Sequence, residues 1–230
     1  MGGGTFASSG TRTPLDDVVL SLARARHDKA RPAICFIGTA TGDDAGYIAR
    51  FHAAFADVAE TSHLALFSRT VEDITPFLLG QDAICVGGGN TASLLAVWRA
   101  HGVDAALRLA HDARVVLAGA SAGSICWFES GTTDSFGPTL HALTGGLGLI
   151  PGSHSPHYDG EPQRRPTYQR LIEVASLPAG IAVDDHAAAI YDGPELVEVV
   201  AAHAGPTAYR VERGPDGRAI ETPLAARLLP

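Results

Sequence analysis

The stretch RVVLAGASAGSICWF, residues 114–128, decides the fold class of this chain. Its apolar start ends in Gly119-Ala-Ser121-Ala-Gly123, and a helix-like pattern follows. A serine framed by small residues and two glycines, at a strand-to-helix turn, is typical of a nucleophile elbow that exposes the serine hydroxyl. The glycines allow the close backbone approach and unusual dihedral angles that so tight a turn requires. The stretch therefore predicts a strand-turn-helix unit and serine-based acyl transfer.

Short apolar runs alternate with helical patterns before this stretch. We expect strands at 33–38, 62–67, 82–86 and 114–118, and helices at 16–26, 45–59, 71–79, 91–101 and 105–111. This alternation predicts an α/β fold with a mainly parallel sheet that helices cover on both faces. Function in such folds lies at the carboxyl ends of the strands. The loop Gly87-Gly-Gly-Asn90 and the Ser121 turn should therefore lie near each other.

The pattern changes after residue 130. Residues 131–166 are rich in Gly, Pro and His and are expected to form loops, followed by a helix at 166–175. Short strands at 181–183, 187–191, 196–202 and 208–212 predict antiparallel hairpins at the sheet edge. Because no repeat or linker divides the chain, we expect one domain over residues 1–230, with a flexible segment at residues 1–14.

Composition excludes several classes of protein. Hydrophobic residues make up 46% of the chain, enough for a sizeable core, and the net charge of −8 argues against a nucleic-acid partner. No apolar run approaches the ~20 residues of a membrane span, and no secretory signal is evident. The three cysteines, Cys35, Cys85 and Cys126, lie far apart and favour buried thiols over disulfides or zinc. We expect a cytoplasmic protein with no membrane partner.

A serine nucleophile needs a base and a group that orients the base. His157, in the polar loop Ser153–Gly160, is the first candidate for the base, and His154 is its rival. The orienting carboxylate is either in Asp184-Asp185, after an expected strand, or Asp134. The residues alone do not separate these carboxylates.

The tetrahedral intermediate needs two N–H donors for its oxyanion. One would be the N–H of Ala122, directly after the nucleophile, and the other a glycine N–H in Gly87-Gly88-Gly89. The glycine loop could instead cradle a phosphate, but it lacks the lysine of a P-loop. His154, His157 and Asp159 could suggest a metal site, but no further ligand pair completes it. We therefore expect neither a metal nor an organic cofactor.

Four motifs in order resemble one family of peptidases. They are Cys85-Val-Gly-Gly-Gly-Asn-Thr91, Gly119-Ala-Ser-Ala-Gly123, Pro156-His-Tyr-Asp159 and Gly180-Ile-Ala-Val-Asp-Asp185. Together they resemble the peptidase E (aspartyl dipeptidase) and cyanophycinase family over roughly residues 33–212. The resemblance implies a flavodoxin-like three-layer sandwich, similar to class I glutamine amidotransferases, with serine in place of the usual cysteine nucleophile.

The resemblance also implies roles for individual residues. Ser121 matches the nucleophile, His157 the base and Asp185 the acidic residue that orients it. Gly88 or Gly89, together with Ala122, matches the oxyanion hole. The substrate-binding candidates are Arg170, which resembles the family's arginine for an acidic side chain and has Arg164 and Arg165 as rivals, together with Asn90 and Asp134. A guanidinium suits that role because it binds a carboxylate through two parallel hydrogen bonds.

Two departures from the family pattern affect these expectations. The cluster Gly2-Gly-Gly4 resembles the loop after a first strand, so the sheet is expected to be short of that strand. The stretch after His157 differs from strict Asp-X dipeptidases, so the resemblance leaves the choice of substrate open. We expect a serine dipeptidase that acts on small peptides with an acidic N-terminal residue, and a homodimer is plausible from the family. The alternatives are a non-catalytic amidotransferase-like binding protein and an amidase or esterase for a non-peptide substrate.

Overall fold

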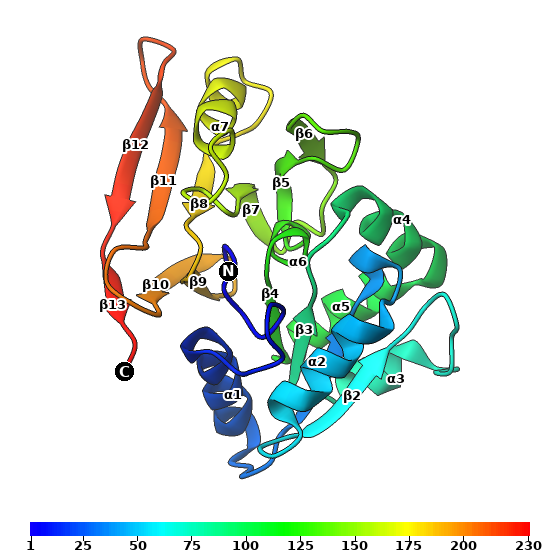
Figure 1. Cartoon of the computed structure of the whole chain (residues 1–230). Coiled ribbons are helices and arrows are strands. Elements are labelled where there is room, and N and C mark those ends of the chain that lie inside the picture. Colours follow the sequence, from blue (N-terminus) through cyan, green and yellow to red (C-terminus); the bar gives the residue numbers. More distant parts are fainter.

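The computed structural model describes residues 1–230, and its first half is built on a parallel sheet (Figure 1). Four strands pair in the order β2-β1-β3-β4, and all their pairings are parallel. These strands are β1 (Ala33–Ile37), β2 (Glu60–Leu64), β3 (Ala83–Val86) and β4 (Val116–Gly119). Parallel neighbours place the loops after β3 and β4, which carry Gly88 and Ser121, at the same edge of the sheet.

Helices cover both faces of this sheet, as the β-α alternation predicts. Ile34 and Phe36 point from β1 into a cluster with one pair of helices, whereas Cys35 and Ile37 point into the opposite cluster. This alternation follows from the period of two in a strand. The first pair is α1 (Pro14–His27) and α2 (Ala45–Phe55), and the opposite group is α3 (Ile74–Leu79), α4 (Thr91–His101) and α5 (Val103–Asp112).

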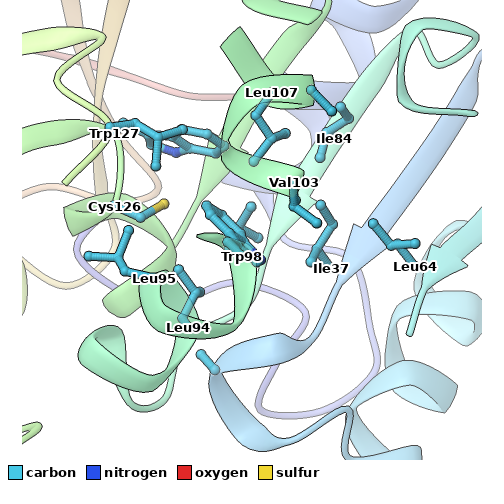
Figure 2. Close-up of a cluster of buried hydrophobic side chains, with 14 of the residues drawn as sticks. Ile37, Leu64, Ile84, Leu94, Leu95, Trp98, Val103, Leu107, Cys126 and Trp127 are labelled. Carbon is cyan, nitrogen blue, oxygen red and sulfur yellow. The ribbon is translucent and has the colours of Figure 1, made fainter. Parts of the chain in front are cut away.

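The larger core cluster surrounds Trp98 of α4 (Figure 2). Trp98 is buried, and its indole N–H donates to Thr39 Oγ1 at 3.2 Å, in the short 3-10 helix η1 (Thr39–Thr41). Trp127 and Cys126, which directly follow the Ser121 turn, pack in the same cluster. The chain that carries Ser121 is thus held by the core on its C-terminal side.

The second half forms two further sheets. Six strands pair in the order β12-β11-β8-β7-β5-β6, and three in the order β13-β10-β9. Their bounds are β5 (Phe128–Thr133), β6 (His141–Thr144), β7 (Ile150–Ser155), β8 (Gly180–Val183), β9 (Ala187–Asp192), β10 (Glu195–Ala201), β11 (Ala208–Arg213), β12 (Ala219–Leu224) and β13 (Ala226–Leu228). Two more helices complete the fold, the four-residue α6 (Ala122–Ile125) and α7 (Arg164–Glu173), which packs on the six-stranded sheet.

An apolar groove of about 680 Å³ lies between β4 and β9, each of which is an edge strand. Val116–Gly119 line one side of the groove and Ala188–Asp192 the other. Met1 lies at its end, where the terminal ammonium donates to the Gly119 carbonyl at 3.0 Å. Neither β4 nor β9 pairs with a further strand on the side that faces the groove.

Several local expectations differ from the structure. Strands β5, β6 and β7 occupy residues that we expected to form loops, and β12 and β13 were not expected at all. The alternation of apolar and polar residues that indicates a strand is missing from β5 and β7, because buried polar residues replace apolar ones there. Thr132 and Ser155, for example, are buried and share a hydrogen bond of 2.8 Å between their hydroxyl groups. Apolar periodicity cannot reveal strands whose inner faces are polar.

The N-terminal segment also differs from the flexible segment that we expected over residues 1–14. Phe6 is only 5% exposed and packs edge-on against Phe36, with ring centroids 5.7 Å apart. Its backbone N–H donates to Asp16 Oδ2 at 2.8 Å. The packing of Phe6 thus orders a segment that is rich in glycine and serine. No helix of the structure combines the length and the apolar character that a membrane crossing requires.

Candidate active site

Ser121 lies in a strained turn between β4 and α6. Its backbone has φ 56° and ψ −123°, a conformation that a residue with a side chain rarely adopts. The turn leaves the Ser121 side chain partly exposed, whereas the residues that follow it are buried. A serine held in this way at the end of a parallel strand has the geometry of a nucleophile elbow.

The two glycines of the motif are required by close backbone packing. A Cβ on Gly119 would lie 1.9 Å from the Gly123 carbonyl oxygen, and a Cβ on Gly123 would lie 2.1 Å from the Val86 carbonyl oxygen. Gly88, in the loop after β3, approaches Ser121 itself: a Cβ there would lie 3.1 Å from Ser121 Cβ. The glycine loop and the serine turn are therefore neighbours, as their strand ends predict.

The structure pairs His157 with Asp185 among the three carboxylates considered. His157 Nδ1 lies 2.6 Å from Asp185 Oδ1, and both side chains are partly exposed. This hydrogen bond is the main cause that lowers the pKa of Asp185, and burial opposes it. Asp184 instead accepts the Thr207 N–H through Oδ2, and Asp134 is exposed with no side-chain hydrogen bond.

The segment Met1–Gly3 connects the serine with the His157–Asp185 pair. The Ser121 N–H donates to the Met1 carbonyl at 3.4 Å, and Gly3 lies against both His157 and Asp185, where a Cβ would come within 2.9 Å and 2.2 Å of their side-chain atoms. Ser121 and the His157–Asp185 pair thus contact the same three-residue segment, and no hydrogen bond joins Ser121 to His157 in this structure. Without substrate, hydrogen bonds between catalytic groups are often long or poorly aligned.

His154, the rival base, is part of the interior. It is 2% exposed, stacks on Phe128, and contacts Ser124 Oγ through Nε2 and the Ile181 carbonyl through Nδ1. Burial lowers its pKa to about 3. Both ring nitrogens are engaged and the side chain is almost fully buried, so His154 is held within the interior beside β7.

Three backbone N–H groups were predicted to hold the oxyanion, and the structure distinguishes among them. The Gly88 N–H donates to the Tyr47 hydroxyl at 3.3 Å. The N–H groups of Gly89, at φ 136°, and of Ala122 donate to no loop carbonyl or side chain. Gly89 and Ala122 therefore keep free donors near the serine. Nothing in the sequence indicated that Tyr47 of α2 reaches the glycine loop.

The predicted substrate-binding residues have different environments. Asn90 caps α4, where its Oδ1 accepts the Ser93 N–H at 2.8 Å and its Nδ2 donates to the Ser135 carbonyl at 3.0 Å. Both polar atoms of its amide are thus hydrogen-bonded within the protein, and Nδ2 holds the loop that carries Asp134. Arg170 is exposed on α7 and forms no side-chain hydrogen bond or ion pair.

Arg164, a rival of Arg170, lies closer to the predicted site. It is 3% exposed, its Nη1 donates to the Thr132 carbonyl at 3.1 Å, and its Nε pairs with Glu161 at 2.7 Å. It is near enough to Asp185 to contribute to the lowering of that pKa. No group of three or more His, Cys, Asp or Glu side chains has the arrangement of a metal site.

The sequence matches a family of known peptidases over most of its length. Residues 1–199 match Peptidase family S51. The chain belongs to this family. It is 43% identical, over its whole length and 97% of the relative, to the uncharacterized peptidase YgaJ of Bacillus subtilis (strain 168). The S51 membership and this relative identify the chain as a hydrolase of the peptidase class.

Solved structures of similar proteins share the fold. A peptidase from an acI-B1 Actinobacterium is 18% identical and has a TM-score of 0.70, over 98% of this chain and 92% of that chain. A Listeria monocytogenes EGD-e protein described as a candidate peptidase E is 20% identical, with a TM-score of 0.54 over 96% of both chains. At such identities the likeness concerns the α/β architecture alone.

Proposed function

We propose that this S51 peptidase is a serine dipeptidase that cleaves small peptides with an acidic N-terminal residue through an acyl-enzyme on Ser121. The observation that carries the proposal is the strained turn of Ser121, with φ 56° and ψ −123°, at the end of β4. A conformation of this cost is retained where it has a function, and presenting a nucleophile is such a function. The His157–Asp185 hydrogen bond supports the same assignment.

The proposed mechanism gives each of these groups one role. His157 Nε2 takes the proton of Ser121 Oγ as the oxygen attacks the peptide carbonyl, and Asp185 holds the imidazole through Nδ1. The free N–H groups of Gly89 and Ala122 would stabilise the oxyanion of the tetrahedral intermediate. His157 then gives the proton to the leaving amine. Water attacks the acyl-enzyme in the same way and releases the acid with Ser121 restored.

The first test is covalent labelling of the purified protein with a fluorophosphonate. Ser121 Oγ would form a bond to phosphorus while fluoride leaves, and mass spectrometry would locate the adduct. We expect labelling at Ser121 that is absent in Ser121→Ala, strongly reduced in His157→Ala and unchanged in Ser93→Ala, an exposed serine on α4. A folded protein that does not react would contradict the proposal and favour a non-catalytic binding protein.

A substrate panel tests the finer part of the proposal. We expect Asp-Leu to be cleaved faster than Ala-Leu, and N-acetyl-Asp-Leu more slowly than Asp-Leu, because a dipeptidase recognises the free amino terminus. Small amides and p-nitrophenyl esters serve as the comparison. If these are hydrolysed while every dipeptide is resistant, the enzyme is an amidase or esterase and the dipeptidase assignment is wrong.

A further inference from the structure

A second, polar pocket lies beside the catalytic candidates but contains none of them. It has a volume of about 650 Å³ and is formed by the loop after β7, the start of α7, the end of β8 and the loop between β10 and β11. Asp159 connects it to the candidate active site, because its Oδ1 accepts the backbone N–H of Asp185 at 2.8 Å. None of Ser121, His157 and Asp185 lines this pocket.

Asp184 gives the pocket a buried acceptor without a donor. The residue is 3% exposed, and its Oδ2 accepts the Thr207 N–H at 3.0 Å. Its Oδ1 is buried and has no hydrogen-bond partner. Burial raises the pKa of Asp184 and the nearby Asp159 adds to this effect, whereas the Thr207 N–H and the neighbouring Tyr209 hydroxyl, which forms no geometric hydrogen bond with Oδ1, act to lower it. A buried carboxylate oxygen without a donor is costly, so a ligand that supplied an N–H would be favoured here.

Arg165 gives the same pocket a positive group that is held in place. Its guanidinium packs over two aromatic rings that contact each other, 4.8 Å from the centroid of Tyr158 and 4.7 Å from that of Tyr209. Its Nε is buried without a hydrogen-bond partner and lies 3.6 Å from Glu221 Oε2, while the side chain as a whole is 42% exposed. Stacking fixes the plane of a guanidinium and leaves its N–H edge available for a carboxylate.

The Asp184 carboxylate and the Arg165 guanidinium do not form a hydrogen bond or an ion pair with each other. Arg165 lowers the pKa of Asp184 by its charge, yet no ion pair within 4.0 Å joins the two residues. The pocket therefore offers an acceptor that forms no hydrogen bond and a cation whose one ion pair, with Glu221 at 3.6 Å, is long. We propose that it binds a small zwitterion, whose ammonium donates to Asp184 Oδ1 while its carboxylate is held by Arg165.

Two kinds of small molecule carry both an ammonium and a carboxylate: a free α-amino acid, and a short peptide through its two termini. The ligands that distinguish them are L-alanine and L-alanyl-L-alanine, and the ligands that test the two charges are N-acetyl-L-alanine and L-alaninamide. We would titrate each into Ser121→Ala protein, which cannot turn over the peptide, and follow amide chemical shifts by NMR. Because binding is measured in this variant, the outcome does not depend on the proposed peptidase activity.

We expect L-alanine or the dipeptide to shift signals of the pocket residues, with affinity at least tenfold higher than that of both masked analogues. Asp184→Asn and Arg165→Gln should each weaken binding at least tenfold, whereas Arg170→Gln, an exposed arginine of the same helix, should not change it. If Asp184→Asn does not fold, Arg165→Gln decides, since its side chain is partly exposed. Equal binding of the masked analogues, unchanged binding in Arg165→Gln, or no shifts up to about 50 mM ligand would overturn the proposal.

Discussion

His157 Nδ1 and Asp185 Oδ1 are 2.6 Å apart, and glycines enclose the carboxylate on two sides. A Cβ on Gly3 would lie 2.2 Å from Asp185 Oδ1, and a Cβ on Gly160 would lie 2.2 Å from Oδ2. The Asp185 backbone is held as well, because its N–H donates to Asp159. Residues from the N-terminus, the loop after β7 and the end of β8 thus fix one carboxylate against one imidazole.

Replacement of Asp185 tests which carboxylate orients the base. In Asp185→Asn, an amide N–H would face Nδ1 and favour the tautomer whose Nε2 is already protonated, so His157 could not accept the serine proton. We expect kcat for a cleaved dipeptide to fall by roughly 10²–10⁴-fold with little change in KM. Asp134→Asn is the matched control, since Asp134 is exposed and unbonded. A larger loss in Asp134→Asn would transfer the role to that residue.

Glycine replacements separate the stability of the elbow from its chemistry. Gly123→Ala would place a Cβ 2.1 Å from the Val86 carbonyl oxygen, so the backbone must move, at a cost of about 1–3 kcal/mol. In Gly88→Ala the closest atom to the added Cβ is Ser121 Cβ at 3.1 Å, and we expect a loss in kcat/KM of about tenfold or more with little loss of stability.

The control for both is Gly46→Ala, near the start of α2. The nearest atom to its added Cβ is a side-chain oxygen of Asp44 at 3.3 Å, and alanine is favoured over glycine in a helix by about 1 kcal/mol. Denaturation curves and kcat/KM for the three variants provide the comparison. Wild-type activity in Gly88→Ala would show that the glycine loop does not approach the reacting atoms.

Much of the first half could be predicted because short strands, most of them apolar, alternate there with helices. The four strand positions led to the prediction that Gly88 and Ser121 are neighbours, and the structure confirms it. The resemblance to the peptidase E and cyanophycinase family is likewise confirmed by the S51 match. Spacing alone left Asp134, Asp184 and Asp185 equivalent, because the pairing of a carboxylate with His157 depends on contacts 28 residues apart.

The second half was harder to predict for a physical reason. Its central strands bury hydroxyl groups and an imidazole, such as Ser153, His154 and Thr132, in place of aliphatic side chains. Hydrogen bonds among these groups satisfy them, as between Ser153 Oγ and the Tyr168 hydroxyl at 2.8 Å. A hydrophobicity pattern cannot detect a strand that is stabilised in this way. The roles of Tyr47 and Gly3 were missed because both depend on long-range contacts.

The three arginines of α7 allow a test of substrate charge. Arg164 is buried next to Thr132 and acts on Asp185, whereas Arg170 is exposed and unpaired. If the enzyme prefers Asp-Leu to Ala-Leu, we expect Arg164→Gln to reduce that preference at least tenfold and Arg170→Gln to leave it unchanged. The ratio of the two kcat/KM values is the readout, because it cancels a general loss of active protein. A ratio that falls only in Arg170→Gln would restore the role expected from the sequence resemblance.

The buried imidazole of His154 should make stability depend on pH. Burial lowers its pKa to about 3, whereas an unfolded histidine titrates near 6.5. Between these values the unfolded chain binds the extra proton, so the His154 contribution to the free energy of unfolding falls as the pH falls, by up to about 1.4 kcal/mol per pH unit. In His154→Gln this dependence is absent. The stability of wild type relative to His154→Gln should therefore decrease steadily from pH 6 to pH 4, as urea denaturation would measure.

Asp16 contributes a pH dependence of stability whose sign is opposite to that of His154. Burial raises its pKa to about 6, so its contribution to stability is present in full below the unfolded value near 3.9 and is lost as the pH rises through 6. The stability of wild type relative to Asp16→Asn should thus increase over the same interval from pH 6 to pH 4. The two effects oppose each other in the wild-type protein, and only the variants separate them. If the His154→Gln and wild-type curves run parallel with pH, His154 takes up its proton equally in both states and does not sense acid through its burial.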